Sequence, residues 1–221
     1  MSTASRQQPN AASRIALLGA TGGTGRQIVA KAIARGHHVT ALVRDPAKAR
    51  VLEGAEIVAG DALDPASLRT LVTGKDYVIS ALGTALSPIR EVTFLSRATQ
   101  ALVDAMRAEG VSRLICITGI GAGDSAGHGG FLFDRLIMPL LLRNVYADKN
   151  RQEAIIRASG LDWTLVRPSL LNNKPERGAV RALTDLSDFH GGAISRADVA
   201  NFIMDEIHGG SWRHRAPLIS W

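Results

Sequence analysis

A glycine turn near the start of the chain carries the clearest chemical signal in the sequence. Gly19, Gly22 and Gly25 recur at every third position after the apolar residues 15–18, and an amphipathic stretch begins with them. Glycines let a turn curl tightly and approach a diphosphate closely, while the free N–H groups of the following helix face the negative charge. This order of strand, glycine turn and helix predicts dinucleotide binding, with a purely structural turn as the alternative.

The residue that follows the second apolar run bears on the choice of dinucleotide. NAD-binding proteins usually place a carboxylate there to hold the ribose 2′-hydroxyl, whereas a basic group accommodates the 2′-phosphate of NADP. Arg44 stands at this position, and its guanidinium can fork onto phosphate oxygens. Asp45 follows at once, so a shift of one residue would exchange the two. The residues favour NADP(H), and a solvated arginine at a strand end is the alternative.

Short apolar runs that alternate with helical periods must position these residues. The predicted strands are residues 15–18, 39–43, 56–59, 77–81, 114–118 and 163–166. Unbroken Val, Ile and Leu runs are typical of strands that are buried on both faces, and helices between them imply a parallel sheet with right-handed crossovers. The clearest helix has apolar residues at helical spacing over 92–106, and Asp64 and Ser195 begin two others. We therefore predict a single α/β domain with a Rossmann-type, doubly wound parallel sheet.

Length and composition agree with one domain. A chain of 221 residues with 46% hydrophobic content can bury a full core. Residues 1–13 are small and polar and lack the apolar centre of a secretory signal, so we expect a flexible tail ahead of the domain at 14–221. The most apolar later stretch, 131–142, is broken by charges and a proline and is shorter than the ~20 residues that span a bilayer. We expect a cytoplasmic protein that makes no membrane contact.

The formal net charge of +6 does not by itself indicate nucleic acid as a partner. The basic residues are scattered, no nucleic-acid-binding motif is present, and aromatic residues are too sparse for a stacking platform. A positive cleft for an anionic cofactor or substrate accounts for part of the excess. The single Cys116 lies in an apolar run and has no partner for a disulfide or a metal cluster, so no metal site is predicted.

Motifs along most of the chain resemble one known family. Besides the glycine turn, they are Gly36 to Pro46, Gly60-Asp61, Ser159 to Pro168, and Ile194-Ser195-Arg196-Ala197-Asp198-Val199-Ala200. With these motifs the chain resembles the atypical short-chain dehydrogenase/reductases, in particular the small NAD(P)H-binding group that includes biliverdin and flavin reductases and the redox-sensing NmrA-like proteins. The resemblance covers nearly everything beyond the tail. It implies that Arg44 contacts the 2′-phosphate of NADP(H).

The resemblance and the topology together extend the predicted cofactor site, because a dinucleotide lies along the C-terminal ends of the strands. The resemblance places Asp61 at the adenine amino group, and Pro168 follows the sixth strand near the nicotinamide. Thr24 and Arg26 lie in the first turn of the first helix, within reach of a phosphate. The predicted cofactor-binding residues are Gly19, Thr21, Gly22, Gly23, Thr24, Gly25, Arg44, Asp61, Ala81, Leu82, Gly83, Lys149 and Pro168.

The catalytic residues of the resembling family are only partly matched. Its typical reductases use a Tyr-x-x-x-Lys pair, in which the tyrosine donates a proton and the lysine lowers its pKa and holds the ribose. Glu153 fits the glutamate that follows the family lysine, which puts Lys149 on the lysine and Val145 on the tyrosine. Tyr146 stands one place off, so its hydroxyl is rotated by about 100° around the helix. Tyr146 and Lys149 remain the predicted catalytic pair.

The family serine is also displaced, which shapes the predicted reaction. Family members often end the fifth strand with two serines, and this chain has Thr118 and Gly119, so Thr118 is the predicted hydroxyl donor. These departures suggest hydride transfer from NADPH to a small conjugated acceptor, such as a flavin, biliverdin or quinone, without a strict tyrosine acid. A non-catalytic NADP(H) sensor of the NmrA type is the alternative. A nucleotide-sugar epimerase or dehydratase is a third hypothesis, and the sequence does not indicate the oligomeric state.

A glycine-rich run, 119–130, follows the fifth strand beside the expected nicotinamide position. Such a segment can close over an acceptor as a lid, with Phe131 or Phe133 stacking on it. A loose connection to a core helix is the alternative. His128 and His190, each near a pair of glycines, are candidate proton donors, although a lone loop histidine is often simply exposed to solvent.

Overall fold

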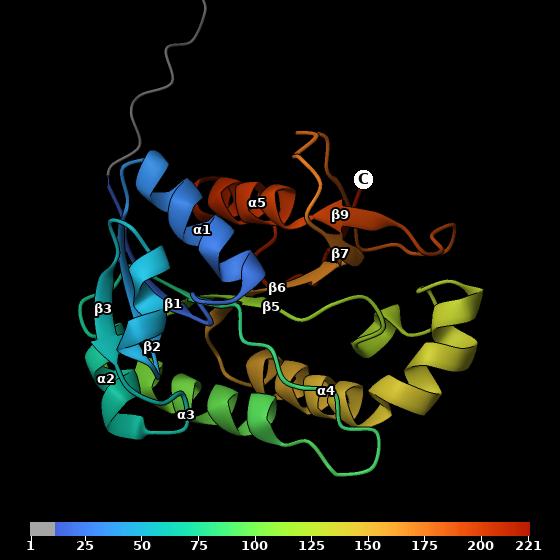
Figure 1. The fold of residues 1–221 in the computed structure, drawn as a ribbon, viewed down its shortest axis with the longest axis horizontal. Coiled ribbons are helices and arrows are strands. Elements are labelled where there is room, and N and C mark those ends of the chain that lie inside the picture. Colours follow the sequence, from blue (N-terminus) through green and yellow to red (C-terminus); the bar gives the residue numbers. More distant parts are fainter. Residues whose placement is uncertain (1–11) are drawn as a thin grey trace, which may run out of the picture.

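A central sheet runs through the computed structural model, which describes residues 12–221 (Figure 1). The predicted tail at 1–13 therefore lies outside the described residues, apart from its last two. The strand order is β3-β2-β1-β4-β5-β6-β10-β8, and all neighbouring strands are parallel except β10 and β8. The strands are β1 (Arg14–Leu18), β2 (His38–Val43), β3 (Glu56–Ala59), β4 (Tyr77–Ser80), β5 (Arg113–Ile117), β6 (Asp162–Pro168), β8 (Arg181–Leu183) and β10 (Leu218–Ser220).

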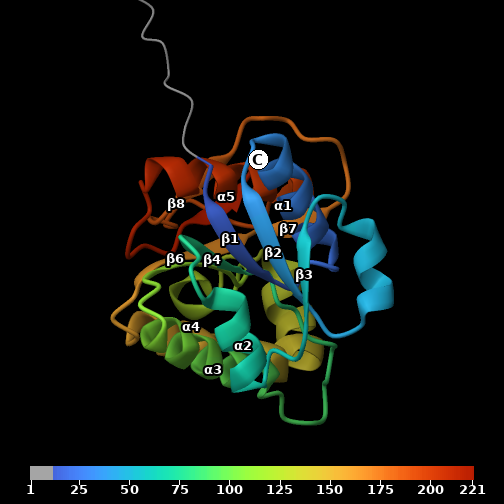
Figure 2. The same cartoon turned by 90° about the vertical axis from the view of Figure 1, so that its left-hand side faces the viewer.

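Helices cover both faces of this sheet (Figures 1 and 2). On one face α1 (Gly23–Ala34) packs against α5 (Arg196–Gly209). The other face carries α2 (Pro65–Val72), α3 (Phe94–Ala108) and α4 (Arg143–Arg157). Beside the main sheet, β7 (Leu170–Asn172) and β9 (Ala193–Ser195) form a small parallel pair. The predicted Rossmann-type, doubly wound α/β fold is confirmed.

The core explains why the strands read as unbroken apolar runs. In β1, Ile15 and Leu17 pack with residues of α1 and α5, whereas Ala16 and Leu18 pack with residues of α2, α3 and α4. Successive side chains of a strand point to opposite faces, so a strand between two helical layers must be apolar at every position. All four residues are fully buried.

The strand order places one crevice at the centre of the sheet. β2 and β3 lie on one side of β1, and β4 and β5 lie on the other, so the chain reverses its winding direction at β1. Connections leave the carboxyl ends of β1 and β4 in opposite directions at such a switch point, and ligands of open α/β sheets bind there. The glycine turn follows β1 directly and therefore borders this crevice.

The predicted helix starts are confirmed by their caps. The Asp64 carboxylate accepts hydrogen bonds from the backbone N–H groups of Ala66 and Ser67, and α2 begins at Pro65. Ser195 Oγ accepts from the Asp198 N–H at 3.0 Å, and α5 begins after it. Side-chain oxygens that satisfy free N–H groups in this way stabilise the first turn of a helix.

Some elements differ from the sequence prediction. Strands β7, β8, β9 and β10 were not predicted, because three residues are too few to carry a periodic signal. The apolar stretch after the glycine-rich run forms a π-helical segment, Phe133–Leu142, that contains Pro139 and leads into α4. In the described part of the chain, no helix is both long and apolar enough to cross a membrane.

Candidate active site

The glycine turn is packed so tightly that it excludes side chains. Gly19 has φ +78°, and a Cβ there would collide with the Ala81 carbonyl oxygen and lie 2.9 Å from the Leu82 nitrogen. At Gly25 a Cβ would collide with the Gly19 carbonyl oxygen and lie 2.7 Å from Ala20 Cα. Glycine is required at both positions because backbone atoms occupy the space that a side chain would need. The turn therefore brings bare backbone to the edge of the crevice.

The helix that follows this turn offers its N-terminus to an anion. Gly22 is the N-cap of α1 and supplies no side-chain hydrogen bond, and the first turn contains no acidic residue. The first N–H groups of a helix lack partners within the helix and carry a partial positive charge. Thr24 is half-buried and Arg26 is exposed in this turn. A glycine cradle under an uncapped helix end fits the diphosphate of a dinucleotide.

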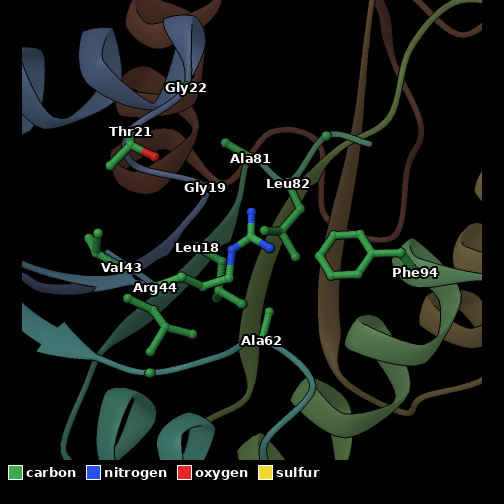
Figure 3. Close-up of a pocket in the computed structure, with 13 residues that line it drawn as sticks. Leu18, Gly19, Thr21, Gly22, Val43, Arg44, Ala62, Ala81, Leu82 and Phe94 are labelled. Carbon is green, nitrogen blue, oxygen red and sulfur yellow. The ribbon is translucent and has the colours of Figure 1, made fainter. Parts of the chain in front are cut away.

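A cleft of about 290 Å³ opens beside the turn at the switch point (Figure 3). It is lined by Leu18, Gly19, Thr21, Gly22, Leu42, Val43, Arg44, Gly60, Ala62, Ala81, Leu82, Gly83 and Phe94. Predicted site residues from the turn, from the end of β2 and from the segment after β4 therefore meet in one place. The predicted residues Gly23, Thr24, Gly25, Asp61, Lys149 and Pro168 do not line this cleft.

Apolar side chains that the sequence analysis did not single out complete the cleft. Leu42, Ala62, Leu82 and Phe94 contribute its apolar surface, and Figure 3 shows Phe94 at the side opposite the glycine turn. Flat apolar walls suit an adenine ring. Phe94 starts α3, far from the turn in sequence, so only the fold brings it to the cleft.

The side chains of Arg44 and the neighbouring Asp45 lie in different places and make different contacts. Figure 3 shows the Arg44 guanidinium extending within the cleft toward Leu82. The Asp45 carboxylate instead accepts a hydrogen bond of 3.0 Å from the Ala47 N–H, where it caps the 3₁₀ helix Pro46–Val51. A carboxylate that caps a helix outside the cleft does not compete for a ribose. The basic residue, rather than the acidic one, faces the cleft.

Asp61 stands in sequence between two residues that line the cleft but does not line it itself. Its Oδ1 accepts a hydrogen bond of 2.8 Å from the Leu63 N–H, which forms a local turn. The flanking residues Gly60 and Ala62 line the cleft itself. A Cβ at Gly60 would collide with Ser67 on α2, so this wall is closely packed. The assignment of Asp61 to the adenine amino group stays a prediction.

The predicted catalytic pair meets at Gly119, just beyond β5. A Cβ built at Gly119 would lie 3.2 Å from Lys149 Nζ and 3.5 Å from the Tyr146 hydroxyl. Gly119 has φ +145°, a conformation that favours glycine. Lys149 Nζ donates a hydrogen bond to the Thr118 carbonyl oxygen, which fixes the amine beside the end of the strand. The offset of Tyr146 along the helix therefore does not separate it from Lys149.

Burial shifts the pKa values of both Tyr146 and Lys149. Burial lowers the pKa of Lys149 to about 8, and the nearby Cys116 and Glu153 oppose that shift only in part. Burial also raises the pKa of Tyr146 to about 12. Removal of a group from water disfavours its charged form, which is an ammonium for lysine and a phenolate for tyrosine. At neutral pH the tyrosine is protonated and the lysine still carries its charge.

The Thr118 hydroxyl faces a buried ion pair. Its Oγ1 donates to Glu153 Oε1 at 2.8 Å, and Arg167 donates to the two oxygens of Glu153 at 3.0 and 2.5 Å. Glu153 and Arg167 are 2% and 1% exposed, and Arg167 also pairs with Asp124 in the middle of the glycine-rich loop. Thr118, Glu153 and Arg167 thus form a network that joins β5, α4 and β6. In the sequence, Glu153 serves only to align the family lysine, and an arginine near the end of a buried strand is the available signal for the rest of the network.

An apolar pocket of about 370 Å³ lies next to this pair. It is lined by Ile120, Gly129, Gly130, Phe131, Leu132, Phe133, Ile137, Leu170, Gly191 and Gly192. Phe133 meets Tyr146 edge to face, with ring centroids 6.2 Å apart. Phe131, which also lines the pocket, is 79% exposed. None of these lining residues carries a titratable group, so the pocket suits an apolar, aromatic ligand.

The glycine-rich loop is tied down rather than loosely connected. Gly123 N–H donates to Asn150 Oδ1 on α4 at 2.8 Å, and Gly191 N–H donates to the His128 carbonyl at 2.8 Å. His128 Nδ1 lies 3.0 Å from the Phe189 carbonyl oxygen, and its ring stacks on His190 with centroids 5.8 Å apart. The two histidines therefore join the loop to the segment 189–192, of which Gly191 and Gly192 line the apolar pocket. Their use as proton donors stays a prediction.

Comparison with known proteins gives one family. The model of the NAD(P)H-binding family matches residues 19–209 of this chain. A Bacillus subtilis protein named as an uncharacterized sugar epimerase, YhfK, is 29% identical over 209 residues, which cover 92% of each chain. An NAD(P)H azoreductase from Xenophilus azovorans is 30% identical over 156 residues, which cover 70% of this chain and 47% of the azoreductase.

Solved structures agree with the fold. ChuY, described as an anaerobillin reductase from Escherichia coli O157:H7, superposes with a TM-score of 0.80 at 24% identity, over 94% of this chain and 97% of ChuY. A short-chain dehydrogenase/reductase from Veillonella parvula in complex with NADP superposes with a TM-score of 0.78 at 18% identity, over 95% of this chain and 94% of that one. The predicted resemblance and the predicted nicotinamide dinucleotide cofactor are both confirmed.

Proposed function

The chain belongs to the NAD(P)H-binding family, and from that premise we propose that it is an NADPH-dependent reductase of a small conjugated acceptor, such as a flavin, a biliverdin or a quinone. One observation carries the proposal. Tyr146 and Lys149 both approach Gly119, and the next residue, Ile120, lines the apolar pocket. An acceptor in that pocket would lie beside the catalytic pair.

The preference for NADPH rests on Arg44. Its guanidinium extends within the cleft, while Asp45 caps a helix outside it. A guanidinium presents paired N–H donors that match the oxygens of a phosphate. We assign Arg44 to the 2′-phosphate, and we assign the glycine turn and the start of α1 to the diphosphate.

The side chains near Gly119 suit an acceptor that stabilises its own charge. NADPH, when bound, supplies the hydride. Lys149 is held by the Thr118 carbonyl and is in place to orient the nicotinamide ribose, and Tyr146 is a protonated but weak acid. The Thr118 hydroxyl already donates to Glu153 and is therefore a positioning group here. A conjugated ring that spreads the added charge needs less help from a general acid than a simple carbonyl does.

Relatives with reductase names support this class of reaction. They include the azoreductase, which is 30% identical to this chain over 156 residues. An azo dye and a flavin share a flat, conjugated shape, and Phe131 and Phe133 offer aromatic faces to such a ring. The name of the Bacillus subtilis relative makes a sugar epimerase the second candidate.

The test is to follow NADPH oxidation by the purified chain with a panel of flavins, biliverdin, quinones and azo dyes. We expect turnover with at least one of these acceptors. Tight NADPH binding with no turnover of any acceptor would instead favour a redox sensor. Conversion of a nucleotide sugar without net NADPH consumption would favour an epimerase.

A pair of variants locates the acceptor. Phe131→Ala is expected to raise KM for the acceptor, because it removes an aromatic wall of the apolar pocket. Leu86→Ala is the matched control, since Leu86 is also exposed but lies outside this pocket. Equal effects of the two variants on KM would contradict the placement of the acceptor.

A further inference from the structure

The start of α5 contacts the start of α1 through one arginine. Arg196 is the first residue of α5 and Gly23 is the first residue of α1. A Cβ built at Gly23 would lie 2.8 Å from Arg196 Nε and 2.9 Å from its Cδ. The Arg196 side chain therefore lies directly against the bare backbone of the turn that faces the diphosphate. Gly23 is not one of the three regularly spaced glycines of the turn, so this contact gives a separate reason for a glycine there.

The two helix ends differ in their charge balance. At α5, Asp198 lies in the first turn and is fully buried, where it accepts hydrogen bonds from Ser195 Oγ, from Trp221 Nε1 and from the Arg177 N–H. At α1 the first turn has no acidic residue and no side-chain cap. The N-terminus of a helix carries a partial positive charge, so a cation is unfavourable there unless an anion accompanies it. Arg196 lies against Gly23 and so adds a positive charge at the N-terminus of α1, where no acidic side chain balances it.

The partners of Arg196 set it apart from the buried arginines of this fold. Its one side-chain hydrogen bond within residues 12–221 runs to the neutral Asn173 Oδ1, at 2.8 Å. By contrast, Arg113 pairs with Glu206 at 2.6 Å, and Arg167 pairs with Glu153 at 2.5 Å. Arg196 is half-buried and has no carboxylate at ion-pair distance in the described part of the chain. Asn173 fixes one edge of the guanidinium and leaves its other N–H groups for another acceptor.

We propose that Arg196 binds the cofactor diphosphate at the N-terminus of α1, and that Gly23 leaves the space in which its guanidinium lies. The inference rests on the proposed function, because it takes the glycine turn as the diphosphate site. It divides the two phosphate groups of the cofactor between two arginines. Arg44 contacts the 2′-phosphate that distinguishes NADPH from NADH, whereas Arg196 contacts the diphosphate that both cofactors share.

The proposal is tested by calorimetric titration of the full chain with NADPH and with NADH. Loss of a charge-assisted hydrogen bond is expected to raise Kd about tenfold or more, so Arg196→Ala should weaken both cofactors to a similar degree. Arg44→Ala should weaken NADPH alone. Arg35→Ala is the control for loss of one positive charge, because Arg35 lies at the far end of α1 and pairs with Asp205.

Competition by 2′-AMP separates the two arginines further, since this nucleotide carries the 2′-phosphate and no diphosphate. Its inhibition constant against NADPH should rise for Arg44→Ala and stay unchanged for Arg196→Ala. Gly23→Ala is a second variant, expected to displace the Arg196 guanidinium and to raise Kd for both cofactors while the melting temperature of the ligand-free protein stays near that of the parent.

Arg196→Ala that binds NADPH and NADH as tightly as the parent would overturn the inference and leave the proposed function intact. The same holds if Arg196→Ala weakens NADPH alone, since Arg196 would then read the 2′-phosphate. A parent protein that binds neither cofactor would overturn the proposed function and this inference together.

Discussion

The two ends of the proposed site are built from different parts of the chain. The adenosine end is the cleft beside the glycine turn, where we place that half of the cofactor, and the acceptor end is the apolar pocket with the residues around Gly119, where we place the acceptor. At the adenosine end, backbone forms the surface, and Gly19 and Gly25 are packed so closely that neither position has room for a Cβ. At the acceptor end, the side chains of Tyr146 and Lys149 converge on Gly119, and Thr118 faces a buried ion pair. A surface made of backbone fixes a shape that many sequences can share, whereas side chains set the chemistry of one protein. The departures from the resembling family fall at the second end.

The two ends also differ in electrostatics. Arg44 is exposed within an open cleft, so its charge remains solvated until a ligand arrives. Burial at the acceptor end lowers the pKa of Lys149 to about 8, and a buried ion pair joins Glu153 to Arg167. Groups removed from water interact more strongly and cost more when left unpaired. Substitutions at the acceptor end should therefore affect the stability of the fold as well as function.

The largest effect on binding is expected from Gly19→Ala. The new Cβ would collide with the Ala81 carbonyl at a position with φ +78°, so the turn must shift and Kd for NADPH should rise about a hundredfold. Gly36→Ala is the matched control, because Gly36 has φ +81° with open space around it. It should cost about 1–2 kcal/mol of stability and leave Kd unchanged. Similar Kd values for the two variants would show that the turn does not set the cofactor site.

The largest effect on stability is expected from Glu153→Ala. It leaves the Arg167 guanidinium buried with Asp124 as its one remaining side-chain partner among residues 12–221, and breaking a buried pair typically costs about 3–5 kcal/mol. Asp76→Ala is the control, because it removes a pair with Arg14 that is exposed to solvent and should cost about 1 kcal/mol or less. Urea unfolding measures both free energies. Equal losses of unfolding free energy in the two variants would contradict the prediction that the buried pair stabilises the fold more than the exposed one.

The two ends also differ in how far they could be predicted from the sequence. The glycine turn and Arg44 are local in the chain, and the central strands and two helix caps carry their own patterns, so the fold and the adenosine end could be predicted. Phe94 reaches the cleft only because α3 packs in one apolar cluster with residues of β4 and β5. The contact of Arg196 with Gly23 joins distant segments and has no sequence pattern of its own. The hydrogen bond from Thr118 to Glu153 also joins distant segments and could not be predicted from the sequence.

Arg44→Ala tests the adenosine end through one phosphate. Removal of a bidentate, charge-assisted contact should cost about 1.5–3 kcal/mol, so Kd for NADPH should rise about tenfold or more while Kd for NADH stays nearly unchanged. Arg50→Ala is the control, since Arg50 is an exposed arginine on the adjoining 3₁₀ helix and does not line the cleft. Equal weakening of both cofactors by Arg44→Ala would mean that Arg44 does not contact the 2′-phosphate.

Lys149→Met tests the electrostatic cost at the acceptor end through pH. The pKa of Lys149 is lowered from 10.5 to about 8, so between these values the unfolded chain binds more protons than the folded one. The destabilisation caused by burying the charged amine is therefore at its full value below pH about 8. It becomes smaller as pH rises toward 10.5. Relative to Lys149→Met, the parent should gain stability as pH rises through that window.

The measurement for this prediction is urea unfolding of both proteins at several pH values. The slope with pH is the readout, because the packing changed by the substitution alters stability by an amount that does not depend on pH, whereas the cost of the buried charge does depend on it. Lys48→Met, at an exposed lysine, controls for the loss of one positive charge. A constant difference between parent and Lys149→Met across the window would contradict the lowered pKa.

The smallest effect is expected from Tyr146→Phe. A positioned general acid is typically worth 10²–10⁴-fold in rate, and we expect a loss of less than about tenfold in NADPH-dependent flavin reduction. Burial raises the pKa of Tyr146 to about 12, so the hydroxyl is a weak acid, and a conjugated acceptor can receive hydride before it is protonated. Tyr77→Phe, on β4, is the matched control. A fall of a hundredfold or more for Tyr146→Phe alone would restore the ordinary tyrosine mechanism, and the acceptor end would then follow the resembling family as closely as the adenosine end does.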